Sequence, residues 1–110
     1  MTTQSPARRL IVRYAVGPEH VEQNEQLVRA VYAELHARTP AGLRYRTFRV
    51  GDGGEFLHLA FTETADGQSP LLELPAFRAF QTGLGERCTQ PPVLSELHEL
   101  GSFGWGDRAG

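Results

Sequence analysis

The sequence predicts an α+β domain whose strands and helices follow one another in the order βαββαβ. Four short stretches have the pattern of strands, two of them apolar on both faces, two longer stretches carry an apolar stripe with the period of a helix, and glycine or proline separates them. In the ferredoxin-like arrangement of this order, four antiparallel strands form one sheet and both helices lie on one face of it. The 110 residues suit a single domain, with an expected core at about residues 9–105 and loose tails at 1–8 and 106–110.

The first half of the chain supplies one strand and the long helix. Residues 9–16 alternate as a strand, and one face of it carries Leu10, Val12, Tyr14 and Val16. Gly17 and Pro18 end this strand. Residues 18–37 then repeat apolar side chains at helical spacing, and Asn24 interrupts the apolar stripe.

The second half supplies the remaining elements. Residues 43–50 and 55–62 read as two strands joined by a glycine-rich hairpin. Ser69 and Pro70 have the character of a helix cap and a first-turn proline. We expect a second helix over 75–87 and a fourth strand over roughly 93–100.

The two strands expected at the centre of the sheet are apolar on both faces. In the third strand, Leu57, Leu59 and Phe61 alternate with Phe56 and Ala60. Two helices cover only one face of a four-stranded sheet, so the other face needs a second cover. A second copy related by a two-fold axis supplies it, and the sequence therefore predicts a homodimer of the dimeric α/β barrel type.

Composition bounds the partners and the compartment. The formal net charge of −2 argues against nucleic acid as a partner. Residues 1–7 lack the apolar stretch of a signal peptide, and no apolar run approaches a membrane span. A single cysteine, Cys88, allows no internal disulfide. We expect a cytoplasmic protein of bacterial type that has no membrane partner.

Four segments resemble the antibiotic biosynthesis monooxygenase family of dimeric α/β barrels: residues 9–16, Pro40 to Tyr45, the strand 56–62, and Leu74 to Phe80. The resemblance implies a substrate pocket between sheet and helices, where oxidising members transform aromatic, quinol-like or polyketide compounds without metal or flavin. In those relatives the third strand carries a polar residue and, four positions on, a tryptophan. Here the corresponding residues are His58 and Thr62.

His58 and Asn24 are the candidate catalytic residues. As a base, His58 would take a proton from a phenolic or quinol hydroxyl and leave an anion that reacts with dioxygen. Asn24 could orient a substrate oxygen or a water. Each residue also has a structural interpretation, as a buried polar side chain hydrogen-bonded to its neighbours. The predicted substrate-binding residues are Tyr14, Thr62, Phe77 and Phe80.

The remaining polar candidates are assigned structural roles. Arg13, on a central strand, is expected to form an ion pair with Glu96 or Glu99 of the fourth strand in the dimer interior, with an anion-binding role as the alternative. Glu96 and His98 share one side of a strand, but the spacing indicates no third ligand, so no metal site is predicted.

Two functions remain open after the sequence. The first is a cofactor-independent monooxygenase of a small aromatic, quinol-type or polyketide compound. The second is a non-redox protein of the same fold that binds or isomerises a small ligand.

Overall fold

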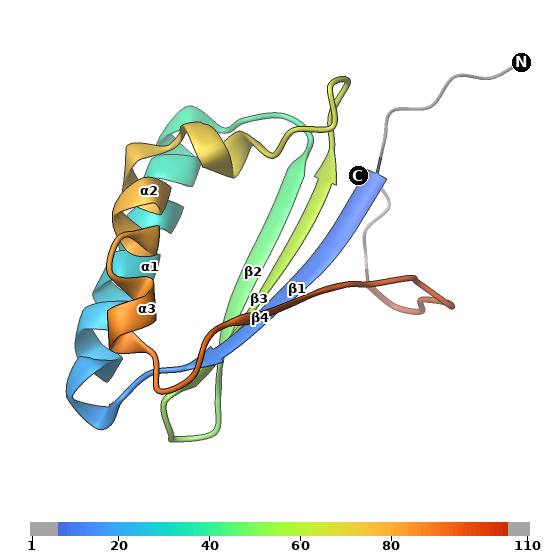
Figure 1. Cartoon of the computed structure of the whole chain (residues 1–110). Coiled ribbons are helices and arrows are strands. Elements are labelled where there is room, and N and C mark those ends of the chain that lie inside the picture. The colour runs from blue at the N-terminus through green and yellow to red at the C-terminus, as the bar shows by residue number, and fades with distance from the viewer. Residues whose placement is uncertain (1–6, 106–110) are drawn as a thin grey trace, which may run out of the picture.

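The computed structural model describes residues 7–105, which form one sheet with all helices on one of its faces (Figure 1). The strands are β1 (Ala7–Ala15), β2 (Leu43–Val50), β3 (Glu55–Glu63) and β4 (Val93–Glu96). Their order across the sheet is β2-β3-β1-β4, and every neighbouring pair is antiparallel. The predicted ferredoxin-like α+β fold is therefore confirmed.

The helical layer begins with a short 3-10 turn, η1 (Pro18–His20), which leads into the long helix α1 (Val21–Arg38). A second 3-10 turn, η2 (Pro70–Glu73), precedes α2 (Pro75–Gln81) and α3 (Leu84–Arg87). The Ser69 hydroxyl caps η2 by accepting a hydrogen bond from the backbone N–H of Leu71. No helix within residues 7–105 is long and apolar enough to cross a membrane.

The prediction of one continuous helix over 75–87 was wrong. The backbone leaves helical geometry at Thr82, and Gly83 adopts a positive φ of 79° before α3 starts. Glycine has no Cβ and takes this left-handed conformation without strain. The break turns the chain so that Arg87, at the end of α3, is buried.

The strand register separates the side chains of the sheet into two sets. On the face toward the helices, Tyr14 pairs with Phe56 and Val12 pairs with His58. The buried core lies on this face and contains Tyr14, Val16, Val28, Val31, Phe56, Leu71, Leu74 and Phe80. The opposite, outer face carries Leu57, Leu59 and Phe61, which are only partly buried. Both sets match the parity expected from the sequence.

The end of the chain differs from the prediction. Strand β4 stops at Glu96 rather than near residue 100, although the backbone N–H of Leu97 still donates to the Arg9 carbonyl over 2.7 Å. Residues 98–105 have no regular secondary structure, and the side chains of Leu100 and Phe103 are almost fully exposed. Strand β1 begins at Ala7, inside the stretch expected to be a loose tail, while residues 1–6 and 106–110 lie outside the described residues.

The expected ion pair between Arg13 and the fourth strand was also wrong. Arg13 Nη2 lies 2.9 Å from Glu55 Oε2 on β3, and both side chains are exposed in the single chain. Glu99 instead lies near Arg9, at 3.8 Å between Nε and Oε1. Arg13 stands opposite Leu57 and Val93 on the outer face, and its guanidinium extends toward Glu55 at the start of β3.

Candidate functional site

His58 lies at the centre of the layer between the sheet and the helices. Its position in the middle of β3 directs the ring toward α2, where the Phe80 ring centroid lies 5.3 Å away. Only 4% of His58 is exposed. The rings of Tyr14 on β1 and Tyr45 on β2 flank it at 5.2 and 5.7 Å. A polar ring is thus enclosed by aromatic side chains from three elements.

Both nitrogens of the His58 ring are hydrogen-bonded to hydroxyl groups. Nε2 lies 2.7 Å from the Tyr14 hydroxyl, and Nδ1 lies 2.7 Å from the Tyr45 hydroxyl. Nδ1 also lies 3.1 Å from Thr47 Oγ1, which is 2.8 Å from the Tyr32 hydroxyl. His58 is therefore held between two phenols, one on each side of the ring.

The hydrogen bonds continue from Tyr14 into the helices. Asn24, at 0% exposure in α1, donates from Nδ2 to the Tyr14 hydroxyl over 2.9 Å. Its Oδ1 accepts from Nε of Arg87 over 3.2 Å. Together these residues form what we call the buried polar chain: Arg87, Asn24, Tyr14, His58, Tyr45, Thr47 and Tyr32.

Arg87 is a buried cation with neutral partners. It is 5% exposed, and besides Asn24 it donates to the carbonyls of Phe80 and Thr82 over 2.7 and 3.2 Å. These carbonyls stand at the C-terminal end of α2, where the helix dipole favours positive charge. Its guanidinium also lies over the Phe80 ring, 5.5 Å from the centroid.

Burial keeps the histidine and the tyrosines of the buried polar chain neutral. It lowers the pKa of His58 to about 4, because a charged imidazolium loses its hydration there. Burial also raises the pKa values of the Tyr14 and Tyr45 hydroxyls well above the ordinary value. At neutral pH the site holds an uncharged imidazole and protonated phenols.

The lowered pKa of His58 predicts an acid-sensitive fold. The pKa of the His58 ring is 6.5 in the unfolded chain and about 4 in the native state. Between these two pH values the unfolded state is protonated on His58 and the native state is not, so acid favours unfolding. The free energy of unfolding is expected to fall by about 3 kcal/mol through this window. Urea denaturation of wild type and His58→Gln at a series of pH values checks it. Identical pH slopes in the two proteins would contradict the prediction.

The structure brings most of the predicted site residues together. His58, Asn24 and Tyr14 belong to the buried polar chain, and Phe80 packs on His58. Phe77 is one residue further away, stacked on Phe80 at 6.1 Å between centroids. Thr62 is buried on the same face but takes no part in the chain.

Four members of the buried polar chain were missed from the sequence: Arg87, Tyr45, Thr47 and Tyr32. Tyr45 and Thr47 share one parity on the second strand, and their register opposite Ala60 and His58 was available from the hairpin. Arg87 gave no such signal, because a basic residue at the end of a helix is ordinarily exposed.

No family model and no curated protein matches the sequence. Among solved structures, a protein from Mycobacterium tuberculosis is similar at 20% identity and TM-score 0.69, over 90% of this chain and 100% of the other. Two further proteins are named provisionally as antibiotic biosynthesis monooxygenases. The one from Nitrosomonas europaea is 16% identical with TM-score 0.70, over 94% and 100% of the two chains. The one from Caulobacter crescentus is 19% identical with TM-score 0.67, over 89% and 92%.

The chain has the antibiotic biosynthesis monooxygenase fold. This agrees with the resemblance seen in the four sequence segments. At these identities the likeness concerns the fold, and the residues of the site must be judged by their own geometry.

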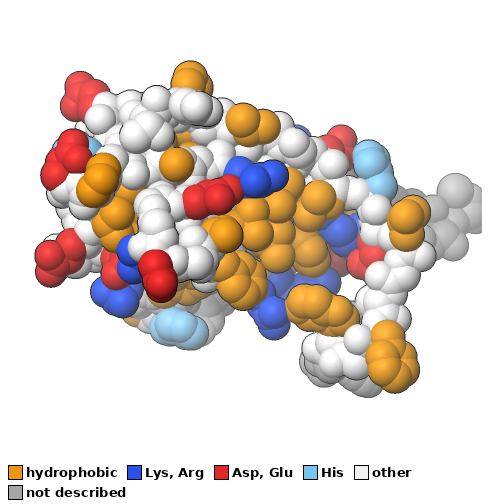
Figure 2. Space-filling view, turned by 90° about the horizontal axis from the view of Figure 1, so that it is seen from below, with side chains coloured by type: hydrophobic (Ala, Val, Ile, Leu, Met, Phe, Trp, Pro, Cys, Tyr) orange, Lys and Arg blue, Asp and Glu red, His pale blue; other side chains and the backbone are white. Residues whose placement is uncertain are grey.

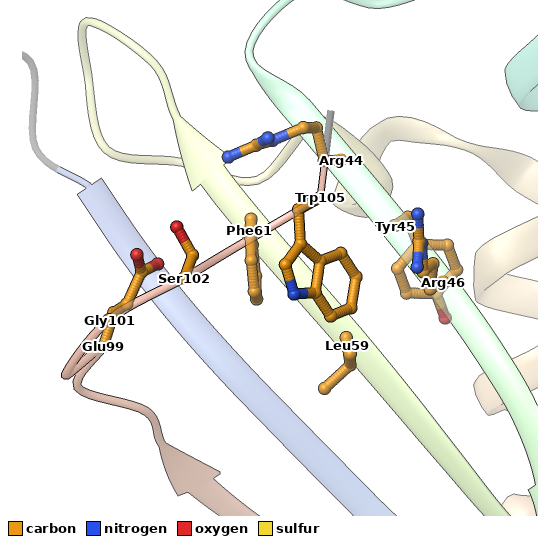
Figure 3. Close-up of a pocket in the computed structure, with 9 residues that line it drawn as sticks. All are labelled: Arg44, Tyr45, Arg46, Leu59, Phe61, Glu99, Gly101, Ser102 and Trp105. Carbon is orange, nitrogen blue, oxygen red and sulfur yellow. The ribbon is translucent and has the colours of Figure 1, made fainter. Parts of the chain in front are cut away.

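The outer face of this antibiotic biosynthesis monooxygenase fold carries the cavity drawn in Figure 3, of about 580 Å³. Trp105 from the C-terminal segment stands over the sheet, with Arg46 Cζ 5.0 Å from its ring centroid. Arg44 stands over Phe61 at 5.6 Å. Two further cavities, of about 520 and 400 Å³, are also lined by residues other than His58 and Asn24.

The space around His58 is filled by side chains of the protein itself. The rings of Tyr14, Tyr45 and Phe80 surround the imidazole, and Tyr45 is the least buried of these three. A pocket at His58 therefore stays a prediction. Within residues 7–105, no group of three or more potential ligands from His, Cys, Asp and Glu gathers as a metal site would require.

Proposed function

We propose that this chain is a dimeric α/β-barrel protein that binds a small phenolic or quinol-type aromatic between its sheet and helices and oxidises it with dioxygen, without a cofactor. The observation that carries the proposal is the neutral imidazole of His58 held 2.7 Å from two phenolic hydroxyls. The Tyr45 hydroxyl, on the less buried side, occupies the position that a substrate hydroxyl would take. The provisional names of the structural neighbours support the reaction class.

The substrate itself supplies the electrons that reduce dioxygen in the proposed reaction. A phenol with a ring C–H para to its hydroxyl reacts with one dioxygen to give a quinone and water. One oxygen atom enters as the new carbonyl, and the other leaves as water with the two displaced hydrogens. The substrate supplies every electron, so no external reductant is needed. The protein has to bind the aromatic ring, exclude water and stabilise the phenolate that reacts with dioxygen.

His58 suits a hydrogen-bonding role better than the role of base. Moving a proton from an ordinary phenol, with a pKa of about 10, to an imidazole with a pKa of about 4 is unfavourable by about six powers of ten. A neutral ring that donates to a phenolate incurs no such cost. We therefore assign His58 to holding and stabilising the phenolic oxygen, with Phe80 and Phe77 as apolar walls.

A non-redox function is the second candidate. It is favoured by Thr62, which stands where the oxidising relatives carry a tryptophan, and by the hydrogen bonds that satisfy both His58 nitrogens. Such a protein would bind or isomerise the same class of aromatic ligand and would consume no oxygen.

Oxygen uptake separates the two candidates. With a panel of quinols and hydroxylated polyaromatics, we expect wild type to consume dioxygen, and His58→Gln to lose about 100-fold or more of the rate. His36→Gln, at the far end of α1, serves as a matched control with unchanged rate. Ligand binding by wild type without oxygen uptake would contradict the oxygenase and support the second candidate.

The outer face of the sheet supports the dimer. Phe48, Val50 and Val93 are 44%, 43% and 61% exposed there, beside the partly buried apolar residues of β3. The space-filling view shows hydrophobic side chains gathered in the middle of one face, with basic side chains around them (Figure 2). A second copy packed on the outer face would also close the cavity under Trp105.

A further inference from the structure

Arg87 determines which atom donates and which accepts in each following hydrogen bond of the buried polar chain. A guanidinium donates and never accepts. The Asn24 atom that lies 3.2 Å from Arg87 Nε must therefore be the carbonyl oxygen, and the amide nitrogen must be the atom 2.9 Å from the Tyr14 hydroxyl. The Tyr14 oxygen thus receives a hydrogen bond from Asn24.

Tyr14 passes this direction on to the histidine. Its own proton has His58 Nε2 as the acceptor, at 2.7 Å. In the reverse arrangement Asn24 and His58 would both donate to the Tyr14 oxygen, and the Tyr14 proton would have no acceptor in a side chain only 4% exposed. Because buried donors without partners are costly, the first arrangement is favoured. A neutral imidazole whose Nε2 accepts carries its proton on Nδ1.

The opposite side of the ring therefore presents a donor. Nδ1–H is directed to the Tyr45 hydroxyl at 2.7 Å, with Thr47 Oγ1 at 3.1 Å. Tyr45 accepts this bond, and its hydroxyl is also hydrogen-bonded to the Thr47 side chain. Unlike Tyr14, Tyr45 is only partly buried, so its own proton has Thr47 Oγ1 or solvent as an acceptor. An oxygen without a proton at this place would accept from Nδ1–H and leave no donor unsatisfied.

We propose that Asn24, held by Arg87, is a positioning residue that fixes His58 as the Nδ1–H tautomer, so that the site selects an ionised phenolic oxygen. The choice of ligand rests on the proposed function, whereas the tautomer does not. Asn24 acts through Tyr14 and need not touch the substrate.

The tautomer is tested by NMR on ¹⁵N-labelled protein, through the long-range couplings of the His58 ring. Wild type is expected to show a protonated Nδ1 and an unprotonated Nε2. Asn24→Asp reverses the direction, because a carboxylate only accepts: Tyr14 then donates to Asp, and its oxygen accepts from Nε2–H. The variant keeps an acceptor for Arg87, which favours folding. Gln23→Glu makes the same amide-to-carboxylate change at an exposed position one residue earlier on α1, and is the control that keeps the wild-type tautomer.

If Asn24→Asp does not fold, Tyr14→Phe provides a second test. It removes the proton directed at Nε2 and is expected to give a mixture of the two tautomers. A wild-type ring protonated on Nε2, or a tautomer unchanged in the variant that folds, would overturn the positioning role.

The ligand preference is tested with 4-nitrophenol, which ionises near neutral pH and changes its absorption when it does. Wild type is expected to bind the nitrophenolate at least 10-fold more tightly than the neutral phenol, and Asn24→Asp to lose this preference. Correct tautomers in both proteins without a preference for the anion would overturn the ligand part, while the positioning role would stand. Preference for the anion without oxygen uptake on any quinol would overturn only the oxygenase proposal.

Discussion

Replacing Arg87 by alanine is expected to lower the free energy of unfolding by about 4 kcal/mol. The change removes the donor for Asn24 Oδ1 and for the carbonyls of Phe80 and Thr82, all of which lie in or beside the core. Each buried acceptor without a partner costs about 1–3 kcal/mol, and the lost packing on Phe80 adds to this. The substitution also removes the free-energy cost of burying the Arg87 charge, and this offsets part of the loss in stability.

Urea denaturation of Arg87→Ala beside Arg78→Ala measures the effect. Arg78 is the matched control, because it lies on α2, is exposed, and donates one hydrogen bond to the Leu72 carbonyl. We expect Arg78→Ala to change stability by less than about 0.5 kcal/mol. A loss below about 1 kcal/mol in Arg87→Ala would mean that water replaces the guanidinium and that the buried polar chain does not depend on it.

The face of the sheet on which each strand residue lies could be predicted from the sequence, because one face packs on the helices and the other is the outer face. A residue pattern with period two assigns each side chain of β1 and β3 to one face, and both His58 and Tyr14 were placed correctly in this way. The Asn24 position followed from the helical stripe for the same reason. These are one-dimensional patterns, and the structure preserves them.

Features that depend on two distant segments could not be read in this way. Arg87 is buried because the break at Gly83 turns α3 toward the core, where α1 presents Asn24. The partner of Arg13 was misassigned because both neighbouring strands offer carboxylates, and only the register decides that Glu55 is within reach. The donor and acceptor of each hydrogen bond in the buried polar chain are harder still to predict from sequence, because each assignment depends on all the other contacts of the chain.

The second large effect concerns assembly. Phe48→Asp is expected to convert a dimer into a monomer, because Phe48 lies on the outer face opposite Leu57, where the second copy is proposed to pack. In the single chain this side chain is 44% exposed, so an aspartate there stays hydrated and the fold survives. In the dimer the carboxylate would be buried without a partner, at a cost of several kcal/mol per copy.

Light scattering at micromolar concentration checks the assembly. Wild type is expected at about twice the chain mass of 12.2 kDa, and Phe48→Asp at the mass of one chain. Leu72→Asp is the matched control, since Leu72 is 51% exposed in η2, on the helical layer, and should leave the dimer intact. A monomeric wild type would refute the dimer, and a dimeric Phe48→Asp would show that the copies meet elsewhere. The cavity under Trp105 links this result to the site: if the second copy closes it, the outer face serves assembly, and the face toward the helices is left for the ligand.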